Sequence, residues 1–361
     1  MTPARSDPPR WAWSVAGAAA GLAGIGAVTM VSAVSQVNPD LATRHAIWIG
    51  LGVAAAALLG RTNYRGWSQG AAAIYGLSVC ALLMVPVAGA MRLGATRWLS
   101  VFGFSIQPAE LAKVATVLVL AQDLSAQPSP LPPRALARSA LIAGIPAALI
   151  FLQPDLGSAS VLAAIWLGLV AVAGLSRRTW IRLGVTLVVA APIGWHLLKD
   201  YQRDRLLVFL NPQWDPLGAG YTIIQSIIAI GSGGLRGRGW FAGTQNQLSF
   251  LPERHSDFIF SVIGEEWGWL GCVLVVGLFG VLLRGIARVA ASTTDPHGRL
   301  LAAGIFIWLA YQACVNLGMV MGLLPVVGVP LPLMSYGGSS MVGVWAAVGV
   351  LQSIRRAAAA E

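Results

Sequence analysis

The stretch FLPERHSDFIF, residues 250–260, places four ionisable side chains immediately before a long apolar run. The last of them, Asp257, stands where a helix would begin. A carboxylate in this position has two interpretations. It can be the anion that a helix N-terminus favours, or a general base that takes a proton from a reacting hydroxyl group.

A second group, SIQPAELAK (105–113), carries an acid and an amine inside an apolar segment. Glu110 and Lys113 are three residues apart, so on a helix they share one face and can pair. Glu110 alone could cap the first turn, but capping does not account for Lys113 one turn deeper. Because charged groups at membrane depth cost free energy and mark functional sites, the pair is predicted to face a central polar cavity rather than lipid.

Two further groups are candidates. In LQPDLGSAS (152–160), Asp155 lies at a tight turn and is favoured as the N-cap of the next helix over a role as a ligand. In YQRDRLLVFLNP (201–212), Arg203 and Arg205 flank an aspartate. They form either a solvated face or a pair of guanidinium groups that binds phosphate.

Two other polar stretches have mainly structural interpretations. The run GSGGLRGRG (231–239) lacks the phosphate-loop pattern. It is predicted to be a flexible link, although its amides with Arg236 and Arg238 could cradle phosphate. Glu265 and Glu266 lie roughly 12–13 Å along a helix from the aspartate of the opening stretch. They are predicted to fix helix packing by pairing with arginines from elsewhere.

The elements that must position these groups are membrane helices. The chain has 361 residues, of which 56% are hydrophobic and 11% charged, whereas soluble domains are about 45–50% apolar and about 25% charged. A spanning helix needs about 20 mostly apolar residues, and ten runs are candidates: 13–34, 45–60, 68–88, 108–124, 136–153, 156–174, 180–198, 257–283, 300–323 and 337–354. We therefore predict an all-α polytopic membrane protein, a single domain over residues 1–361 with ten transmembrane helices.

The basic residues predict the orientation. One set of connections holds Arg5, Arg10, Arg61, Arg65, Arg134, Arg138, Arg177, Arg178, Arg182, Arg284, Arg288, Arg299, Arg355 and Arg356; the short connections of the other set hold Arg44, Arg92 and Arg97. Because cytoplasmic loops carry the excess of lysine and arginine, both termini are predicted to be cytoplasmic. The long loop 199–256, between helices 7 and 8, is then external, and Asp257 lies at the outer face.

The external loop contains YTIIQSIIAI (221–230), which is predicted to form a short amphipathic helix at the membrane interface.

Other features of the composition exclude some classes of function. The net charge of +10 is spread among the connections and forms no patch, so nucleic acid is not an expected partner. The three cysteines lie inside apolar runs, with neither a disulfide framework nor metal-ligand spacing.

Five segments are specific enough to compare with known families: ATRWLSVFGFSIQPAELAKV (95–114), QPDLGSA (153–159), YQRDRLLVFLNPQWDPLGAGYTIIQSIIAIGSGGLRGRG (201–239), GTQNQLSFLPERHSDFIFSVIGEEWG (243–268) and PVVGVPLPLMSYGGSS (325–340). Together they resemble the SEDS proteins (shape, elongation, division and sporulation), which are bacterial peptidoglycan glycosyltransferases with ten membrane helices. The form GTQNQLSFLPE resembles the members that act in cell elongation more than those that act in division.

The resemblance implies an enzyme that polymerises lipid II, a disaccharide-pentapeptide on an undecaprenyl diphosphate carrier, at the outer face of the bacterial cytoplasmic (inner) membrane. It also implies a class B penicillin-binding protein and the elongation machinery as partners. The family's essential acid falls on Asp257, and its intramembrane carboxylate and lysine fall on Glu110 and Lys113. Ser256 replaces the more usual threonine, and Ala109 replaces the usual serine.

The chemistry implied by the resemblance agrees with the residues. A sugar hydroxyl is a poor nucleophile and needs a base, so Asp257 is the predicted catalytic residue. A leaving diphosphate needs cations. Arg203, Arg205, His255 and Ser256 are therefore predicted to bind the diphosphate or the sugar. No metal ligand is assigned, although a divalent cation such as Mg²⁺ or Mn²⁺ is a candidate cofactor.

Two alternatives fit the same architecture. A polytopic protein with internal charges could flip lipid II across the bilayer. It could also be a non-catalytic membrane scaffold for the penicillin-binding protein. Composition does not separate these functions, whereas the family resemblance favours the transferase.

Overall fold

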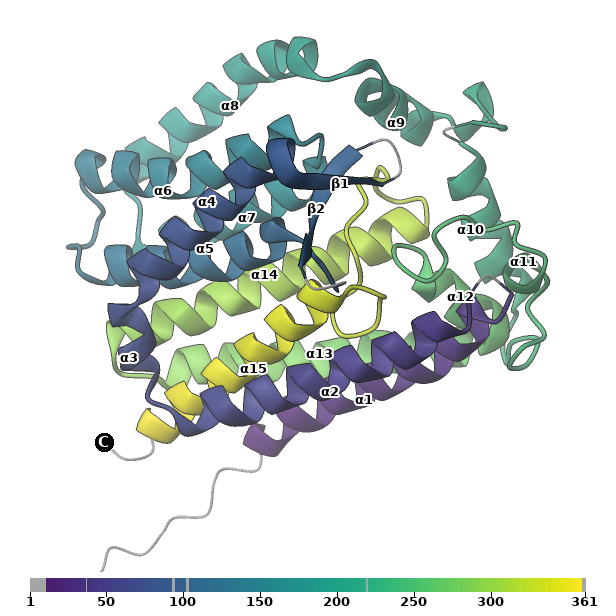
Figure 1. Cartoon of the computed structure of the whole chain (residues 1–361). Helices are drawn as coiled ribbons and strands as arrows, with labels where there is room; N and C mark the ends of the chain where they lie inside the picture. The colour runs from purple at the N-terminus through teal and green to yellow at the C-terminus, as the bar shows by residue number, and fades with distance from the viewer. Residues whose placement is uncertain (1–10, 37, 93–94, 102–103, 219, 359–361) are drawn as a thin grey trace, which may run out of the picture.

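The computed structural model describes residues 11–36, 38–92, 95–101, 104–218 and 220–358, and most of them are helical (Figure 1). Arg5 and Arg10 lie outside the described residues. The helices are α1 (Trp11–Val34), α2 (Asp40–Arg61), α3 (Tyr64–Gln69), α4 (Ala71–Ala88), α5 (Pro108–Ser125), α6 (Pro133–Leu152), α7 (Leu156–Ala173), α8 (Arg177–Leu197), α9 (Asp200–Leu210), the 3₁₀ turn η1 (Pro212–Trp214), α10 (Tyr221–Ser232), α11 (Thr244–Gln247), α12 (Ile259–Glu266), α13 (Gly268–Ser292), α14 (Pro296–Val320) and α15 (Gly338–Ala358).

Ten of these helices correspond to the ten predicted spans. Eight of them are long and apolar enough to cross a membrane by length and composition. The other two are α5 and α15, with 18 and 21 residues. Three charged residues (Glu110, Lys113 and Asp123) lower the hydropathy of α5, and Arg355 and Arg356 end α15. Both helices nevertheless pack inside the bundle, so the polytopic all-α fold is as predicted.

The described ends of the chain lie at one end of the bundle. Figure 1 shows the start of α1 and the end of α15 at the same end, whereas α10, α11 and α12 lie at the opposite end. An even number of crossings brings both ends of a chain to one side, so this arrangement agrees with ten spans.

One predicted span differs from the structure. The run 257–283 is not one helix, because the chain breaks between α12 and α13 at Gly268, where φ is +68°. An ideal Cβ at this glycine would lie 2.2 Å from the Gly237 nitrogen, so the glycine-rich run 231–239 packs directly against the break. The run contains five glycines, and nothing in the sequence distinguishes Gly268 from the other four as the place of the break.

A small sheet lies between α4 and α5, in a stretch that the sequence predicts only as a connection. The strands β1 (Gly89–Arg92), β2 (Ala95–Val101) and β3 (Phe104–Ile106) form an antiparallel meander in the order β1-β2-β3. Leu99 of β2 pairs with Gly89 on one side and with Ile106 on the other. Strand β2 carries Arg97, and the sheet lies over the middle of the bundle in Figure 1.

The core is centred on α14, which packs against α5, α7 and α13. Its buried residues lie around most of its circumference, as expected for a helix surrounded by other helices. In contrast, α8 has no buried residue and lies apart from the bundle in Figure 1. Between α9 and α12, helix α10 packs against α12 through one face that carries Ile223, Ser226 and Ala229.

Candidate active site

Asp257 lies in the turn that precedes α12, near enough to Arg97 of β2 for the two charges to interact. Its backbone N–H donates to the Glu253 carbonyl at 3.1 Å, and its own carbonyl accepts from Asn316 Nδ2 at 2.8 Å. The carboxylate faces residues 325–333 (PVVGVPLPL), here called the proline loop. An ideal Cβ on Gly328, where φ is +71°, would lie 3.4 Å from Asp257 Oδ2.

The surroundings of Asp257 are suited to proton transfer near neutral pH. Burial, together with repulsion from Glu253 and Asp155, raises the pKa of the Asp257 carboxyl to about 7, although Arg205 and Arg97 act to lower it. A carboxyl with this pKa is ionised in a large fraction of molecules at pH 7 and holds a proton firmly once it has accepted one. These are the properties of an efficient general base.

Two arginines line a pocket beside Asp257. The pocket is small and open to solvent, and it is lined by Arg97, Pro154, Leu156, Gln202, Arg205, Leu206, Pro325, Val326 and Val327. Arg97 donates from Nε to the Gln153 carbonyl at 3.1 Å and from a terminal nitrogen to the Pro154 carbonyl. Arg205 donates to the Val326 carbonyl at 3.4 Å. Paired guanidinium groups in such a pocket can bind a phosphate or diphosphate.

Arg97 is a further candidate site residue, and its place in the sequence predicts only the orientation of the chain. The sequence does distinguish Arg97 in two ways. It is one of three arginines on the set of connections that holds few of them, and it lies within segment 95–114, which resembles a known family. Nothing in the local pattern predicts that a strand from the α4–α5 connection and a helix about a hundred residues later meet at one pocket.

The structure separates Arg203 from Arg205. Residues two apart on a helix do not share a face, and Arg203 turns back to the end of α8, where it donates to the Trp195 and His196 carbonyls at 3.1 and 2.9 Å. It also lies 3.6 Å from the exposed Asp200 carboxylate. Of the two predicted phosphate ligands, only Arg205 lines the pocket.

His255 and Ser256 hold the turn that carries the aspartate. The His255 carbonyl accepts from the Tyr336 N–H at 2.8 Å, and its ring lies edge-on to Tyr336 at 5.9 Å between centroids. Burial lowers the pKa of His255. The Ser256 hydroxyl donates to Glu253 Oε2 at 2.8 Å. Their predicted contact with substrate stays a prediction.

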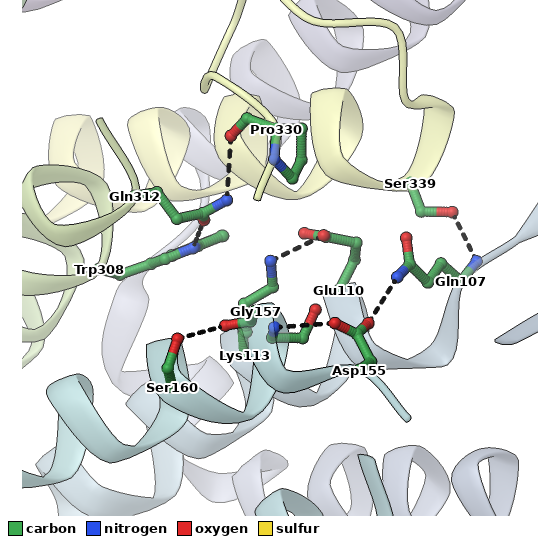
Figure 2. Close-up of polar contacts among 11 residues, drawn as sticks. Gln107, Glu110, Lys113, Asp155, Gly157, Ser160, Trp308, Gln312, Pro330 and Ser339 are labelled. Carbon is green, nitrogen blue, oxygen red and sulfur yellow. Dashed lines mark hydrogen bonds and ion pairs between the residues drawn. The ribbon is translucent and has the colours of Figure 1, made fainter. Parts of the chain in front are cut away.

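Glu110 and Lys113 form the ion pair that their spacing predicts. Lys113 Nζ donates to Glu110 Oε1 at 2.7 Å, and the two side chains are 1% and 2% exposed. Lys113 Nζ also lies 6.0 Å from the ring centre of Trp308, within the range of a cation–π interaction. Figure 2 shows the pair among the polar side chains that meet between the helices of the bundle.

Asp155 caps α7 and also joins this polar group. Its Oδ1 accepts from the Ser158 N–H at 3.0 Å, as the N-cap interpretation predicts. Its Oδ2 accepts from Gln107 Nε2 at 3.3 Å, and the Gln107 N–H donates to the Ser339 hydroxyl at 3.0 Å (Figure 2). Asp155 thus caps α7, and its negative charge also raises the pKa of Asp257 by repulsion.

Glu265 and Glu266 fix packing as predicted, but their contacts are with neutral groups rather than arginines. Glu266 Oε1 accepts from the Ser32 hydroxyl at 2.5 Å and from Asn246 Nδ2 at 2.9 Å. Glu265 accepts from the backbone N–H groups of Gln245 and Asn246 at 2.9 and 3.2 Å. Together these bonds tie α1 and α11 to α12.

The glycine-rich run 231–239 has a structural role in the described chain. Arg238 donates to the Ser232 carbonyl at 3.3 Å and to the Thr244 hydroxyl at 2.9 Å. An ideal Cβ on Gly237 would lie 2.1 Å from the Glu266 carbonyl oxygen, so a glycine is needed for the run to cross the end of α12. The run is thus packed against the helix break rather than being a free link.

Comparisons with known proteins agree with the family-like motifs. Residues 11–360 match the family FTSW_RODA_SPOVE, described as cell cycle protein. The chain is 43% identical to the peptidoglycan glycosyltransferase MrdB of Escherichia coli (strain K12) over 297 residues, which cover 81% of this chain and 78% of that protein.

Two solved structures share the fold. One, described as the structural coordination of polymerization and crosslinking by a peptidoglycan synthase complex, contains a chain that is 36% identical with a TM-score of 0.82, covering 96% of this chain and 98% of that chain. The other is the crystal structure of the rod shape determining protein RodA of Thermus thermophilus. It is 32% identical with a TM-score of 0.72, covering 95% of this chain and 96% of that chain.

Proposed function

Because the chain belongs to the FtsW, RodA and SpoVE family of cell cycle proteins, we propose that it is a peptidoglycan glycosyltransferase that polymerises lipid II during cell elongation. The name of MrdB supports the glycosyltransferase activity, and the likeness to the rod shape determining protein RodA supports the role in elongation. The observation that carries the mechanism is a partly buried carboxyl, Asp257, whose charge interacts with the two arginines of the pocket.

In the proposed step, a sugar hydroxyl of one lipid-linked unit attacks the anomeric carbon of another. The new bond joins that oxygen to the anomeric carbon, and the bond between the anomeric carbon and the phosphate oxygen breaks. The proton of the hydroxyl passes to Asp257 as the general base. The diphosphate leaves on its lipid carrier with the bonding electron pair, and Arg205 and Arg97 stabilise its developing negative charge.

A divalent cation is compatible with this arrangement. Mg²⁺ commonly binds substrate phosphates and keeps several waters. A metal-binding group of three or more histidine, cysteine or acidic side chains is not found in the described part of the chain. A divalent cation that arrives with the substrate diphosphate would supply additional positive charge for the leaving group.

The two arginines of α9 provide a matched test of the diphosphate contact. We expect Arg205→Ala to raise the apparent KM for lipid II about 10-fold, because a charge-assisted hydrogen bond to an anion is lost. Arg203→Ala should change the KM little, since that guanidinium binds the end of α8. Initial rates over a range of lipid II concentrations measure both, and equal KM values for wild type and Arg205→Ala would exclude the contact.

The test of the proposed function itself uses the purified full-length protein in detergent with lipid II. A glycosyltransferase forms glycan chains that separate by length on a gel. A flippase forms none under any condition, and a scaffold forms none whether or not a class B penicillin-binding protein is added. Assays with and without that partner therefore distinguish the transferase from the two alternatives. The related synthase complex, described as coordinating polymerization and crosslinking, supports the choice of partner.

We also propose that the termini are cytoplasmic and the segment 199–256 is outside the cytoplasmic membrane, because of the arginine distribution. In a variant without the three native cysteines, a cysteine at Leu217, which is 89% exposed, should react with an impermeant thiol reagent on intact spheroplasts. A cysteine at Ala126, which is exposed on the connection after α5, should react only after permeabilisation. The reverse pattern would contradict the topology. Asn246 is unsuitable as a labelling position, because it is 1% exposed.

A further inference from the structure

Helix α14 carries three polar side chains in a row within the core. Trp308, Gln312 and Asn316 are four residues apart, a spacing that places them on one face of the helix. They are 1%, 0% and 0% exposed, respectively. Buried polar groups of this kind are costly unless they form hydrogen bonds, so their contacts should indicate why they are there.

The row binds the proline loop and the turn of Asp257. Trp308 Nε1 donates to Gln312 Oε1, and Gln312 Nε2 donates to the Pro330 carbonyl at 3.4 Å (Figure 2). Asn316 Nδ2 donates to two carbonyls, Val329 at 2.7 Å and Asp257 at 2.8 Å. A single amide group thus joins the proline loop to the residue that carries the carboxylate.

The orientation of the Asn316 amide follows from these partners. With the amide reversed, its oxygen would face two carbonyl oxygens, and neither could donate a hydrogen bond. In the observed orientation Oδ1 is buried and has no hydrogen-bond partner within the described residues. The two donor bonds must outweigh the free-energy cost of that unpaired oxygen, so the donors are the part of the side chain that matters here.

The backbone of Asp257 is fixed at both of its polar groups. Its N–H binds the Glu253 carbonyl, and its carbonyl binds Asn316. The regular hydrogen bonds of α12 begin one residue later, where the Ser261 N–H donates to the Phe258 carbonyl at 3.0 Å. The Val329 carbonyl, held by the same amide, follows Gly328, which faces the Asp257 carboxylate. Asn316 therefore sets the distance between the carboxylate and the loop that it faces.

We propose that Asn316 is a positioning residue for glycosyl transfer, whose side-chain N–H groups hold the Asp257 turn and the proline loop at the spacing that the reaction requires. This inference rests on the proposed function, because it assigns Asn316 a role through the predicted base. Asn316 acts on Asp257 and does not itself touch the reacting atoms. A displacement of about 1 Å at a reacting group can cost about 10²-fold in rate, so the loss of this spacing should be measurable.

Gln312 provides a matched control, because it also tethers the proline loop from α14 but does not contact Asp257. Asn316→Leu and Gln312→Leu each replace a buried amide by an apolar side chain of similar size. If the only role of Asn316 were to hold the loop, the two variants would behave alike. If it positions Asp257, only Asn316→Leu should change the properties of the base.

The test measures initial polymerisation rates from lipid II against pH and substrate concentration. We expect Asn316→Leu to lower kcat about 10²-fold, with an unchanged KM. The wild-type rate should rise with pH as the base loses its proton. The midpoint of this rise should move to lower pH in Asn316→Leu, since a loosened turn lets water reach the carboxyl. The other charged groups around Asp257, which are Glu253, Arg205, Asp155 and Arg97, are the same in both variants. Gln312→Leu should keep the wild-type midpoint and lose less activity.

A double-variant cycle completes the test. On the Asp257→Asn background, Asn316→Leu should lower the residual rate little further, because two residues that act through one group are not additive. Thermal unfolding in detergent shows whether each variant is folded. If Asn316→Leu does not fold, Asn316→Ser, which keeps one hydrogen-bond donor, takes its place in the test. Full additivity, or a wild-type kcat and midpoint in Asn316→Leu, overturns the inference. Absence of polymer from wild type would instead reject the proposed function.

Discussion

Asp257→Asn is expected to reduce the rate of glycan polymerisation by about 10²–10⁴-fold, the contribution of a positioned general base. The substitution preserves the shape of the side chain and removes its basicity. Asparagine is also an effective residue at helix N-termini, so the turn before α12 should keep its conformation. The rate and the length of glycan chains are measured with purified proteins and the same penicillin-binding protein present. Asp204→Asn, which neutralises an exposed acid on α9, is the matched control and should keep full activity.

The pH dependence distinguishes a base from a structural carboxylate. Because the base must be deprotonated to accept a proton, the wild-type rate should increase as pH rises through about 7, the pKa to which burial raises the Asp257 carboxyl. The residual activity of Asp257→Asn should not show this increase with pH. Glu253 raises the same pKa, so Glu253→Gln should move the wild-type limb to lower pH. Near-normal polymer from Asp257→Asn would falsify the assignment and leave Asp257 as a helix-terminal anion.

The stability of the same variant should change in the opposite direction to its activity. The pKa of Asp257 is near 7 in the folded protein and near 3.8 as its ordinary value. Between these values the unfolded chain releases a proton that the folded protein retains, so the free energy of unfolding falls as pH rises through that window. Asp257→Asn removes this effect. Its melting temperature at pH 8 should equal or exceed that of wild type, as expected when a site sacrifices stability for function.

The helices and the main acidic candidates could be predicted because their signals are local. A run of about 20 apolar residues suffices to predict a span, and a charged residue inside such a run is conspicuous. Glu110 and Lys113 were found in this way, and their three-residue spacing predicted the ion pair that the structure contains. Asp257 was found because a helix start and a cluster of ionisable residues coincide.

The remaining parts of the site depend on contacts between distant segments. Arg97 reaches the pocket through a short sheet, and Arg205 reaches it from α9. Asn316 has an ordinary polar signal within an apolar helix, and only its two carbonyl partners, 59 and 13 residues away, reveal its role. The break at Gly268 likewise depends on the approach of the glycine-rich run. The local periodicity of the sequence does not predict these contacts between distant segments.

The Glu110–Lys113 pair is the remaining place where a substitution should have a large effect, and its burial complicates the usual test. Removing one partner of a buried ion pair leaves an uncompensated charge and costs about 3–5 kcal/mol of stability. Lys113→Met should therefore unfold at a lower temperature than wild type. A loss of activity in that variant alone would not distinguish a functional charge from a structural one.

The double variant Glu110→Gln with Lys113→Met resolves this ambiguity. Replacing both charges by neutral groups of similar size is often neutral or stabilising, so the melting temperature should return close to that of wild type. We expect polymerisation to remain reduced about 10²-fold or more, because a preorganised cation that stabilises negative charge in the transition state contributes about that factor. Lys113, held by Trp308 and an acid inside the bundle, is preorganised in this sense. If activity recovers together with stability, the pair is a packing element, and the positive charge that the reaction needs comes from Arg97 and Arg205 alone.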